Sequence, residues 1–284
     1  MKHTVTVSIV VPVYNDADAL DDCLKSIAAQ SSMPEEVIVV DNNSTDRTMA
    51  VARQYPFVTI LSEKKQGVVH ARNRGFSAAR GDVIGRLDAD TCIEKDWVAT
   101  IRRLFADGET SAVSGSMTYR AVTWATVLGY ADSSIRHYLA LALGGELALQ
   151  GANMAVRRSA WKNVQHTVCA FQGIHEDFDL SVHLSQAGYT NTFQPSLRAS
   201  VVLRQATGSW GQFARYIITC PATYIKHRRL AGIHILAVAL VVIAAYPVLH
   251  VLHAGYDSST GRFSLEKLLG EKPATRVNPA IFVE

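Results

Sequence analysis

Cysteines, charges and glycine-rich nucleotide signatures are all sparse in this sequence of 284 residues. The four cysteines, at positions 23, 92, 169 and 220, form no CxxC pair, so they indicate neither a disulfide framework nor a zinc site. No GxGxxG follows the first predicted strand, which argues against a dinucleotide-dependent oxidoreductase. Charged residues make up only 19% of the chain and sum to +3, so we expect no nucleic acid as a partner. Because no apolar signal stretch precedes the first strand, we expect the main domain to be cytoplasmic.

Much of the sequence alternates between short β-branched runs and segments with apolar residues at helical spacing. The runs at 5–11 and 37–40 predict buried strands of a parallel sheet, and the apolar spacing between them predicts a helix. The alternation continues with expected strands at 58–61, 82–87 and 112–116 and expected helices at 70–79 and 94–105. This order predicts βαβ winding, with ligands bound beyond the carboxyl ends of the strands.

The stretch 230–252 is the most apolar in the sequence, and a basic cluster at 226–229 precedes it. A membrane-spanning helix needs about 20 such residues, and a basic flank is typical of the cytoplasmic side. Two histidines and Pro247 interrupt the stretch, so spanning, re-entrant and buried core-helix interpretations stay open. We divide the chain into a main domain at 1–220 and a C-terminal part at 221–284, which holds the basic flank, the apolar helix and the tail.

Two aspartates follow the predicted strand at 82–87. Asp88 and Asp90 are two positions apart, so in an extended chain both side chains point to one side and can reach the same hard cation. Magnesium or manganese would suit such oxygen ligands and would neutralise charge on a diphosphate. A DxD also occurs by chance on solvated loops, and its place after a strand is what favours the metal site.

The ends of the first two predicted strands also carry polar and aromatic residues. Tyr14 and Asn15 follow the first strand, and Asp41 opens the segment after the second. Tyr14 could stack on a base, and Asp41 could accept a hydrogen bond from a ring N–H. Taken singly, each favours a structural interpretation, Tyr14 as a tyrosine capping the core and Asp41 as part of an ordinary turn before a helix, and the case for nucleotide binding rests on their convergence.

A series of motifs, in order along the chain, resembles the family 2 glycosyltransferases, whose catalytic domain has the GT-A fold. The motifs are VVPVYN at 10–15, VVDNNSTD at 39–46, Gly67 with ARNRG at 71–75, DAD at 88–90, GANMAVRR at 151–158 and ED at 176–177. The ordered set is more specific than any single member. The resemblance implies an α/β fold of the GT-A type, a nucleotide-binding domain with a mainly parallel sheet flanked by helices, followed here by the C-terminal apolar helix.

The resemblance also implies roles for residues of this chain. The donor nucleotide would be bound by Pro12, Tyr14, Asn15, Asp41, Asn43, Arg72 and Asp88, the metal by Asp88 and Asp90, and Asp177 would be the catalytic base. A carboxylate within hydrogen-bond reach of the acceptor hydroxyl can take its proton as the oxygen attacks the anomeric carbon. Asp177 also fits a purely structural role, since acids are favoured in the first turn of a helix.

The expected function is therefore inverting, metal-assisted sugar transfer from a nucleotide-sugar donor to a glycan or lipid-linked acceptor. We expect the enzyme to act at the cytoplasmic face of the cell membrane, associated through 230–252, with the apolar segment at 119–149 facing the acceptor. A sugar nucleotidyltransferase and a non-catalytic sugar-nucleotide binding module are the alternatives. Two departures from the family pattern are Leu203-Arg204-Gln205, where a histidine ligand is often found, and residues 212–216, which only approximate QxxRW.

Overall fold

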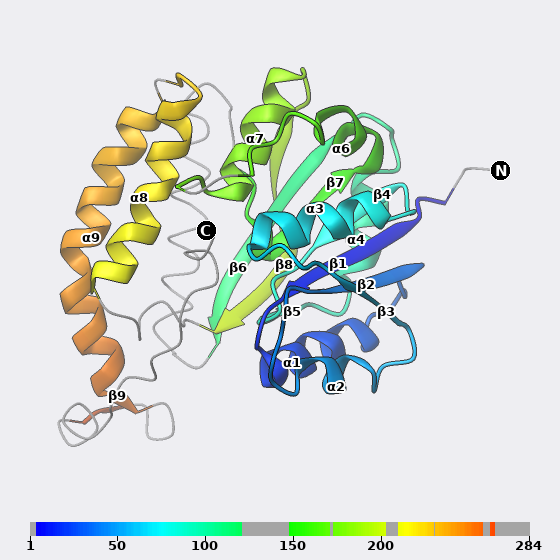
Figure 1. Cartoon of the computed structure of the whole chain (residues 1–284), viewed down its shortest axis with the longest axis horizontal. Coiled ribbons are helices and arrows are strands. Elements are labelled where there is room, and N and C mark those ends of the chain that lie inside the picture. The colour runs from blue at the N-terminus through cyan, green and yellow to red at the C-terminus, as the bar shows by residue number, and fades with distance from the viewer. Residues whose placement is uncertain are drawn as a thin grey trace.

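The computed structural model describes residues 4–120, 148–170, 173–202, 210–229, 231–257 and 262–264. In these residues one eight-stranded sheet has the order β3-β2-β1-β4-β7-β6-β8-β5, and a pair of long helices stands beside it (Figure 1). The strands of the sheet are β1 (Val7–Val13), β2 (Glu36–Asp41), β3 (Val58–Ser62), β4 (Val83–Arg86), β5 (Thr91–Ile93), β6 (Ala112–Arg120), β7 (Met154–Arg157) and β8 (Asn191–Val202). A small second sheet pairs β9 (Tyr256–Asp257) with β10 (Arg262–Phe263).

The first four strands run parallel, as the alternating pattern predicts. β1 pairs with β2 on one side and with β4 on the other, and β3 follows β2. The predicted bounds differ from the observed ones by a residue or two at most strand ends. Because these strands are parallel, their carboxyl ends lie along one edge of the sheet, which is the edge where open α/β sheets bind ligands.

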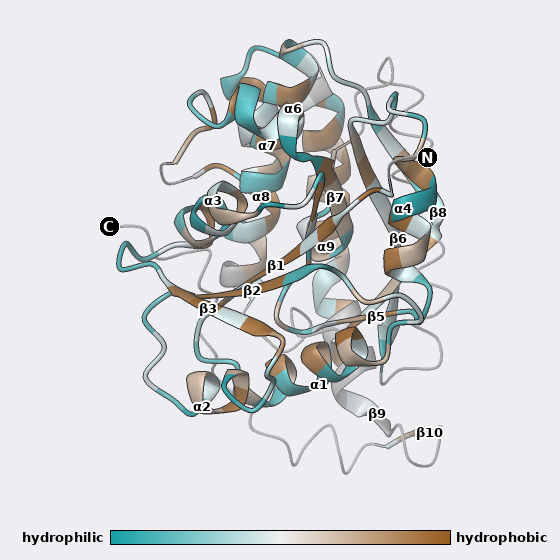
Figure 2. Ribbon diagram, turned by 90° about the vertical axis from the view of Figure 1, so that its right-hand side faces the viewer, coloured by the Kyte–Doolittle hydropathy of each residue, from teal (hydrophilic) through white to brown (hydrophobic). Residues whose placement is uncertain are grey.

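Helices cover both faces of this sheet. They are α1 (Ala17–Ala28), α2 (Thr48–Ala52), α3 (Val68–Ala78), α4 (Trp97–Leu104), α6 (Arg158–Val164) and α7 (Glu176–Gln186), with the short 3₁₀ turn η1 (Gly151–Asn153) before β7. Residues of α1, α2 and α4 form one buried cluster, and residues of α3, α6 and α7 form the other. β1 contributes Ile9 and Val11 to the first cluster and Val10 to the second, so it is apolar on both faces, as its colour in Figure 2 shows.

The second half of the sheet is mixed, which the sequence pattern does not predict. β7 runs antiparallel to both β4 and β6, and β5 runs antiparallel to β8. β8 escapes prediction because Gln194, Pro195 and Arg198 interrupt its apolar alternation. Its pairing with β6 carries a register shift between Gly115 and Ser116, where a bulge accommodates the irregular strand.

The C-terminal helices form a hairpin of α8 (Trp210–Lys226) and α9 (Ala231–Gly255). The predicted division at residue 220 falls inside α8, so the helical unit as observed begins at Trp210. α9 covers almost all of the apolar stretch 230–252. None of the helices in the described part of the chain combines the length and hydropathy that crossing a bilayer requires.

The hairpin is anchored on α7. Phe178 and Val182 of α7 pack with Tyr224 of α8 in a small buried cluster. The outer side of α9 carries exposed apolar side chains, with Val241 70% exposed and Val248 63% exposed. The predicted insertion at 119–149 lies mostly outside the described residues, which resume at 148, and so does Leu203-Arg204-Gln205.

Candidate functional site

The loops that follow β1 and β2 are held together by Asn15. Asn15 follows β1 with a φ of 47°, and its Oδ1 accepts hydrogen bonds from the backbone N–H groups of Thr45 at 2.7 Å and Asp46 at 3.3 Å. Asn15 in turn donates its backbone N–H to the Ser44 hydroxyl at 3.1 Å. The two predicted nucleotide-binding segments therefore form one structure, although they are separated by a helix in the sequence.

Asp41 and Asn43 shape the second of these loops. The Asp41 carboxylate accepts a hydrogen bond from the backbone N–H of Ser44, three residues on, at 2.9 Å, so the loop is closed locally. Asn43 has a φ of 67° and donates its side-chain amide to the Lys64 carbonyl at 2.9 Å, which ties in the loop after β3. The loop therefore contains the turn that the structural interpretation expects, and the nucleotide-binding roles of Asp41 and Asn43 stay predictions.

Pro12 and Tyr14 occupy different positions at the end of β1. Pro12 lies inside the strand, buried and paired with Val40 of β2. Tyr14 is the first residue beyond the strand and is half-buried at the edge. Tyr14 is the better placed of the two to stack on a base.

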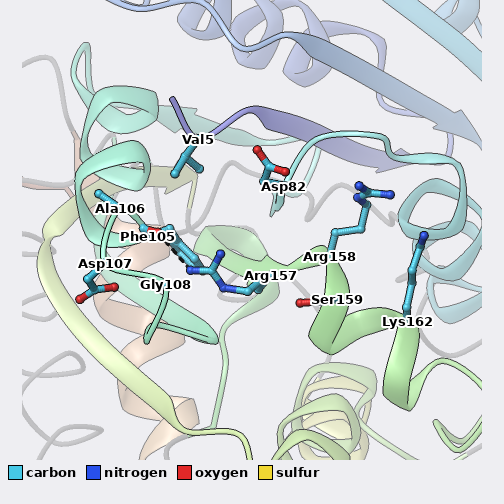
Figure 3. Close-up of a pocket in the computed structure, with 10 residues that line it drawn as sticks. All are labelled: Val5, Asp82, Phe105, Ala106, Asp107, Gly108, Arg157, Arg158, Ser159 and Lys162. Carbon is cyan, nitrogen blue, oxygen red and sulfur yellow. Dashed lines mark hydrogen bonds between the residues drawn. The ribbon is translucent and has the colours of Figure 1, made fainter. Parts of the chain in front are cut away.

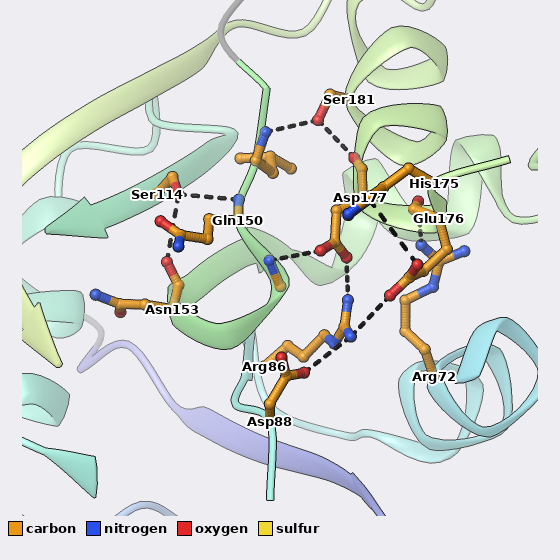
Figure 4. Close-up of polar contacts among 12 residues, drawn as sticks. Arg72, Arg86, Asp88, Ser114, Gln150, Asn153, His175, Glu176, Asp177 and Ser181 are labelled. Atoms are coloured by element: carbon orange, nitrogen blue, oxygen red, sulfur yellow. Dashed lines mark hydrogen bonds and ion pairs between the residues drawn. The ribbon is translucent and has the colours of Figure 1, made fainter. Parts of the chain in front are cut away.

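Arg86 is the centre of the site's charge distribution (Figure 4). It is the last residue of β4, its side chain is 2% exposed, and its guanidinium contacts three carboxylates. Nη2 donates to Asp88 at 3.0 Å and to Glu176 at 2.9 Å, and Nη1 pairs with Asp177. One buried cation thus joins the two acidic motifs, although they are far apart in the sequence.

Asp177 is fixed through both of its carboxylate oxygens. Oδ1 is paired with Arg86, and Oδ2 accepts a hydrogen bond from the Gly151 backbone N–H at 2.8 Å. A Cβ at position 151 would collide with the guanidinium of Arg86 and lie 2.5 Å from Asp177 Oδ1. The start of the GANMAVRR motif therefore needs glycine because the ion pair lies directly against its backbone.

The two acids of the ED motif differ in how readily they hold a proton. Burial raises the pKa of Asp177, and the negative charge of Glu176 adds to that rise, against the opposing effect of Arg86. Burial acts in the same direction on Glu176, but Arg86, His175 and Arg72 outweigh it and lower its pKa to about 2. Of the two, Asp177 is the better proton acceptor because a base with a very low pKa holds a proton poorly.

Asp88 and Asp90 lie beyond β4 with Ala89 between them. Asp88 is 43% exposed on its side chain, so one face of the carboxylate is open while Oδ1 contacts Arg86. Its pKa is raised by loss of solvation; Arg86 opposes that rise, and the charges of Asp90 and Asp177 add to it. The carboxylates there repel one another, and a bound cation would relieve that repulsion.

Arg72 lies beneath this site. It is completely buried in α3, where Nη1 donates to the Glu176 backbone carbonyl at 2.7 Å and Nε donates to Asn73 at 3.0 Å. Direct contact with a phosphate would need a rearrangement, because the side chain has no accessible surface. Its role in donor binding stays a prediction, and its observed contact supports the segment that carries Glu176 and Asp177.

Sequence reasoning missed Arg86 and the importance of Glu176. Arg86 could have been found, since a charged residue closing the otherwise apolar strand Val83–Arg86 needs a buried counter-ion. His175, left out of the predicted site, orients the start of α7 instead. Its backbone N–H donates to Thr223 at 2.8 Å, and its Nε2 lies 3.1 Å from the Tyr216 hydroxyl, both on α8.

A cavity of about 390 Å³ lies at the opposite edge of the sheet (Figure 3). Val5 and Asp82 border it just before β1 and β4 begin, and Arg157, Arg158 and Lys162 supply positive charge. None of the predicted site residues lines this cavity. The carboxyl edge, where the motif residues meet, is therefore the candidate functional site.

Comparison with known sequences gives a family match over the region just described. The model for glycosyl transferase family 2 matches residues 8–164. The glycosyltransferase AglE of Haloferax volcanii is 25% identical over 198 residues, covering 66% of this chain and 64% of AglE. The match thus spans slightly less than two thirds of that relative's length.

Solved structures show that the fold is GT-A-like. A mannosyltransferase from Pyrobaculum calidifontis, in complex with GDP-Man and Mn²⁺, aligns with a TM-score of 0.64 at 19% identity, over 94% of this chain and 78% of that one. S. aureus TarS, in complex with UDP-GlcNAc, aligns with a TM-score of 0.58 at 18% identity, over 78% of this chain and 66% of that one. At such identities the likeness concerns the fold.

Proposed function

Because the chain belongs to glycosyl transferase family 2, we propose that it moves a sugar from a nucleotide-sugar donor to an acceptor hydroxyl by single displacement, with inversion. Glycosyltransferase activity follows from the family, and the donor, the metal and the stereochemical course are the proposed parts. The observation that supports these proposed parts is that Asp88, Glu176 and Asp177 all contact Arg86 (Figure 4). A metal-binding carboxylate and a proton acceptor then share one edge of the sheet with the nucleotide loops.

Asp88 and Asp90 would hold Mg²⁺ or Mn²⁺. Carboxylate oxygens are the ligands that both ions prefer, and the raised pKa of Asp88 beside Asp90 marks a place where positive charge is favoured. When bound, the ion would neutralise charge on the diphosphate of the donor. The structural likeness to a mannosyltransferase solved with Mn²⁺ supports this assignment.

Asp177 would accept the proton of the acceptor hydroxyl. Its raised pKa makes it a stronger base than Glu176, and its N–H contact from Gly151 fixes its orientation. Oδ1 is paired with Arg86, so it becomes free only when the guanidinium shifts. A donor diphosphate near Asp88 offers Arg86 another anion, and we propose that donor binding draws Arg86 away from Asp177.

Turnover with a panel of nucleotide sugars would test this function. The panel should include GDP-linked and UDP-linked donors, and the measured quantity is nucleoside diphosphate released by the full chain. We expect release that excess chelator abolishes and Mg²⁺ or Mn²⁺ restores. Undiminished release in chelator would remove the metal assignment. Binding of a donor with no release under any metal would instead support a non-catalytic binding module.

We further propose action at the cytoplasmic face of the membrane, on a glycan or lipid-linked acceptor. Support comes from α9, where Leu240 is 56% exposed and Val241 is 70% exposed, and from exposed basic residues at the end of α8. Replacing both Leu240 and Val241 with glutamate should move the chain from the membrane fraction to the soluble fraction. A wild-type chain that fractionates as soluble without detergent would contradict this proposal.

A further inference from the structure

Four metal-ligating side chains meet on the side of α7 that the candidate site does not use. They are Cys169 in the segment after α6, Asp179 and His183 on α7, and His227 just after α8. Each offers one ligand atom, and these atoms all lie within 4.8 Å of one another. Cys169 and Asp179 are ten residues apart, and His227 is 48 residues beyond Asp179, so the group lies where the C-terminal hairpin meets the main domain.

The distances within this group are close to those of a coordination sphere. Asp179 Oδ1 lies 3.5 Å from His183 Nε2, and His183 Nε2 lies 3.8 Å from Cys169 Sγ. Tetrahedral zinc, with bonds of about 2.0 to 2.3 Å, separates its ligand atoms by roughly 3.3 to 3.8 Å. Asp179 Oδ1 and His227 Nε2 are closer, at 2.8 Å, and would need to separate slightly on metal binding.

The surroundings hold these groups in place. Asp179 is completely buried, and its Oδ2 accepts a hydrogen bond from the Cys169 backbone N–H at 2.8 Å, which leaves Oδ1 directed at the two imidazoles. The imidazole rings of His183 and His227 lie 4.9 Å apart and are nearly perpendicular, at 88°. Asp179 and His183 are one helical turn apart, so α7 presents both from the same face.

We propose that Cys169, Asp179, His183 and His227 bind one Zn²⁺ ion that fastens the α8–α9 hairpin to α7. A thiolate with two imidazoles selects zinc over Mg²⁺ or Mn²⁺, because those ions prefer all-oxygen sites. Four protein ligands leave no open position, so the role is structural. The site is separate from Asp88 and Asp90, which offer only oxygen ligands.

Cobalt(II) is the probe that distinguishes this site from the edge of the sheet. The purified full chain is stripped with chelator, supplied with excess Mg²⁺, and titrated with Co²⁺ or Zn²⁺. We expect one equivalent of Co²⁺ to give the visible bands of tetrahedral cobalt and a near-ultraviolet thiolate charge-transfer band, which one equivalent of Zn²⁺ removes. A spectrum without the thiolate band in the wild-type chain would overturn the proposal.

Matched variants locate the ligands. Cys169→Ser and His227→Gln should weaken Zn²⁺ binding by about 100-fold or more, since even the loss of an outer-shell partner costs 10- to 100-fold. Cys92→Ser and His234→Gln, at positions outside the group, should bind like wild type. Equal binding by Cys169→Ser and Cys92→Ser would overturn the proposal. If the ligand variants fail to fold, alkylation of Cys169 in the wild-type chain is measured by mass spectrometry with and without Zn²⁺. Zn²⁺ should protect Cys169 from the alkylating reagent, and absence of protection counts against the site.

Discussion

Asp177 and Asp179 are two residues apart on α7, yet their buried carboxylates lie in chemically different surroundings. Asp177 is paired with the guanidinium of Arg86, at the edge where the nucleotide loops meet. Asp179 faces a thiol and two imidazoles, at the junction with the C-terminal hairpin. Positions two apart on a helix point in directions about 200° apart, so one short helix serves both places.

The nature of the positive partner is what separates the two carboxylates. Arginine stays protonated and can move between anions, so a carboxylate paired with it can be released when another anion arrives. Neutral imidazole and thiolate are metal ligands, and a carboxylate among them suits a fixed ion. We therefore expect changes at Asp177 to alter rate and changes at Asp179 to alter stability.

The largest expected effect separates these two roles directly. Asp177→Asn keeps the side chain's size but cannot accept a proton at neutral pH, so sugar transfer should fall by about 10² to 10⁴. Donor affinity should not fall, because the neutral amide holds Arg86 less tightly than the carboxylate does. Asp179→Asn should lower the melting temperature and leave the rate within a factor of a few. Transfer rate and nucleotide affinity measured on both variants check this. A near-wild-type rate for Asp177→Asn would remove Asp177 from the mechanism.

Removing the buried guanidinium of Arg86 should have the next largest effect. Arg86→Met leaves three carboxylates without their shared buried partner, so the free energy of unfolding should fall by about 3 to 5 kcal/mol. Arg80→Met is the matched control. Arg80 pairs with Glu36 but is 84% exposed, so its loss should cost less than about 1 kcal/mol. Urea unfolding of both variants measures the loss in free energy of unfolding. Equal losses for Arg86→Met and Arg80→Met would show that Arg86 is not the partner that holds the site together.

Local pattern is enough to predict the parallel half of the fold. β1 and β2 are continuous β-branched runs with helical spacing between them, and such runs pair with sequence neighbours. β8 depends on partners from distant segments, β6 on one side and β5 on the other, and its Pro195 and Arg198 break the alternation that would reveal it. Its strand character comes from tertiary pairing.

The candidate site likewise has one part that the sequence predicts and one part that it does not. Asp41, Asp88 and Asp177 lie in motifs that can be read along the chain, so their presence at one edge could be anticipated. The bridge through Arg86 could not, because it depends on how β4 and α7 pack. The absence of a CxxC pair argues against a zinc site from the sequence, and the grouping of Cys169 with His183 of α7 and His227 just after α8 arises only in the fold. Ligands assembled from three segments leave no spacing signature.

Acidification tests the ion pair between Arg86 and Glu176, and its expected effect on the free energy of unfolding is smaller. The pKa of Glu176 is about 2, below its ordinary value of 4.5, so Glu176 contributes stability above pH 4.5 that is lost as the pH falls through 2. Asp177, with a raised pKa, acts in the opposite direction, so the net loss is less than about 3 kcal/mol. Glu176→Gln should flatten the fall in unfolding free energy across this window. The exposed Glu94→Gln should keep the wild-type slope, and identical slopes for all three chains would contradict the assignment.

The smallest expected effect concerns His183, which contacts Asp179 at 3.5 Å. Without metal this is a weak hydrogen bond, so His183→Gln in excess chelator should cost no more than about 1 kcal/mol. With Zn²⁺ the wild-type chain should melt at a higher temperature than in chelator, because an ion that binds only the folded state stabilises it, whereas His183→Gln should gain little. Melting of wild type, His183→Gln and the exposed control His234→Gln, each with chelator and with Zn²⁺, separates the two cases. If zinc raises the melting temperature of His183→Gln as much as that of wild type, His183 is not a ligand, and its part in the group around Asp179 reduces to a hydrogen bond.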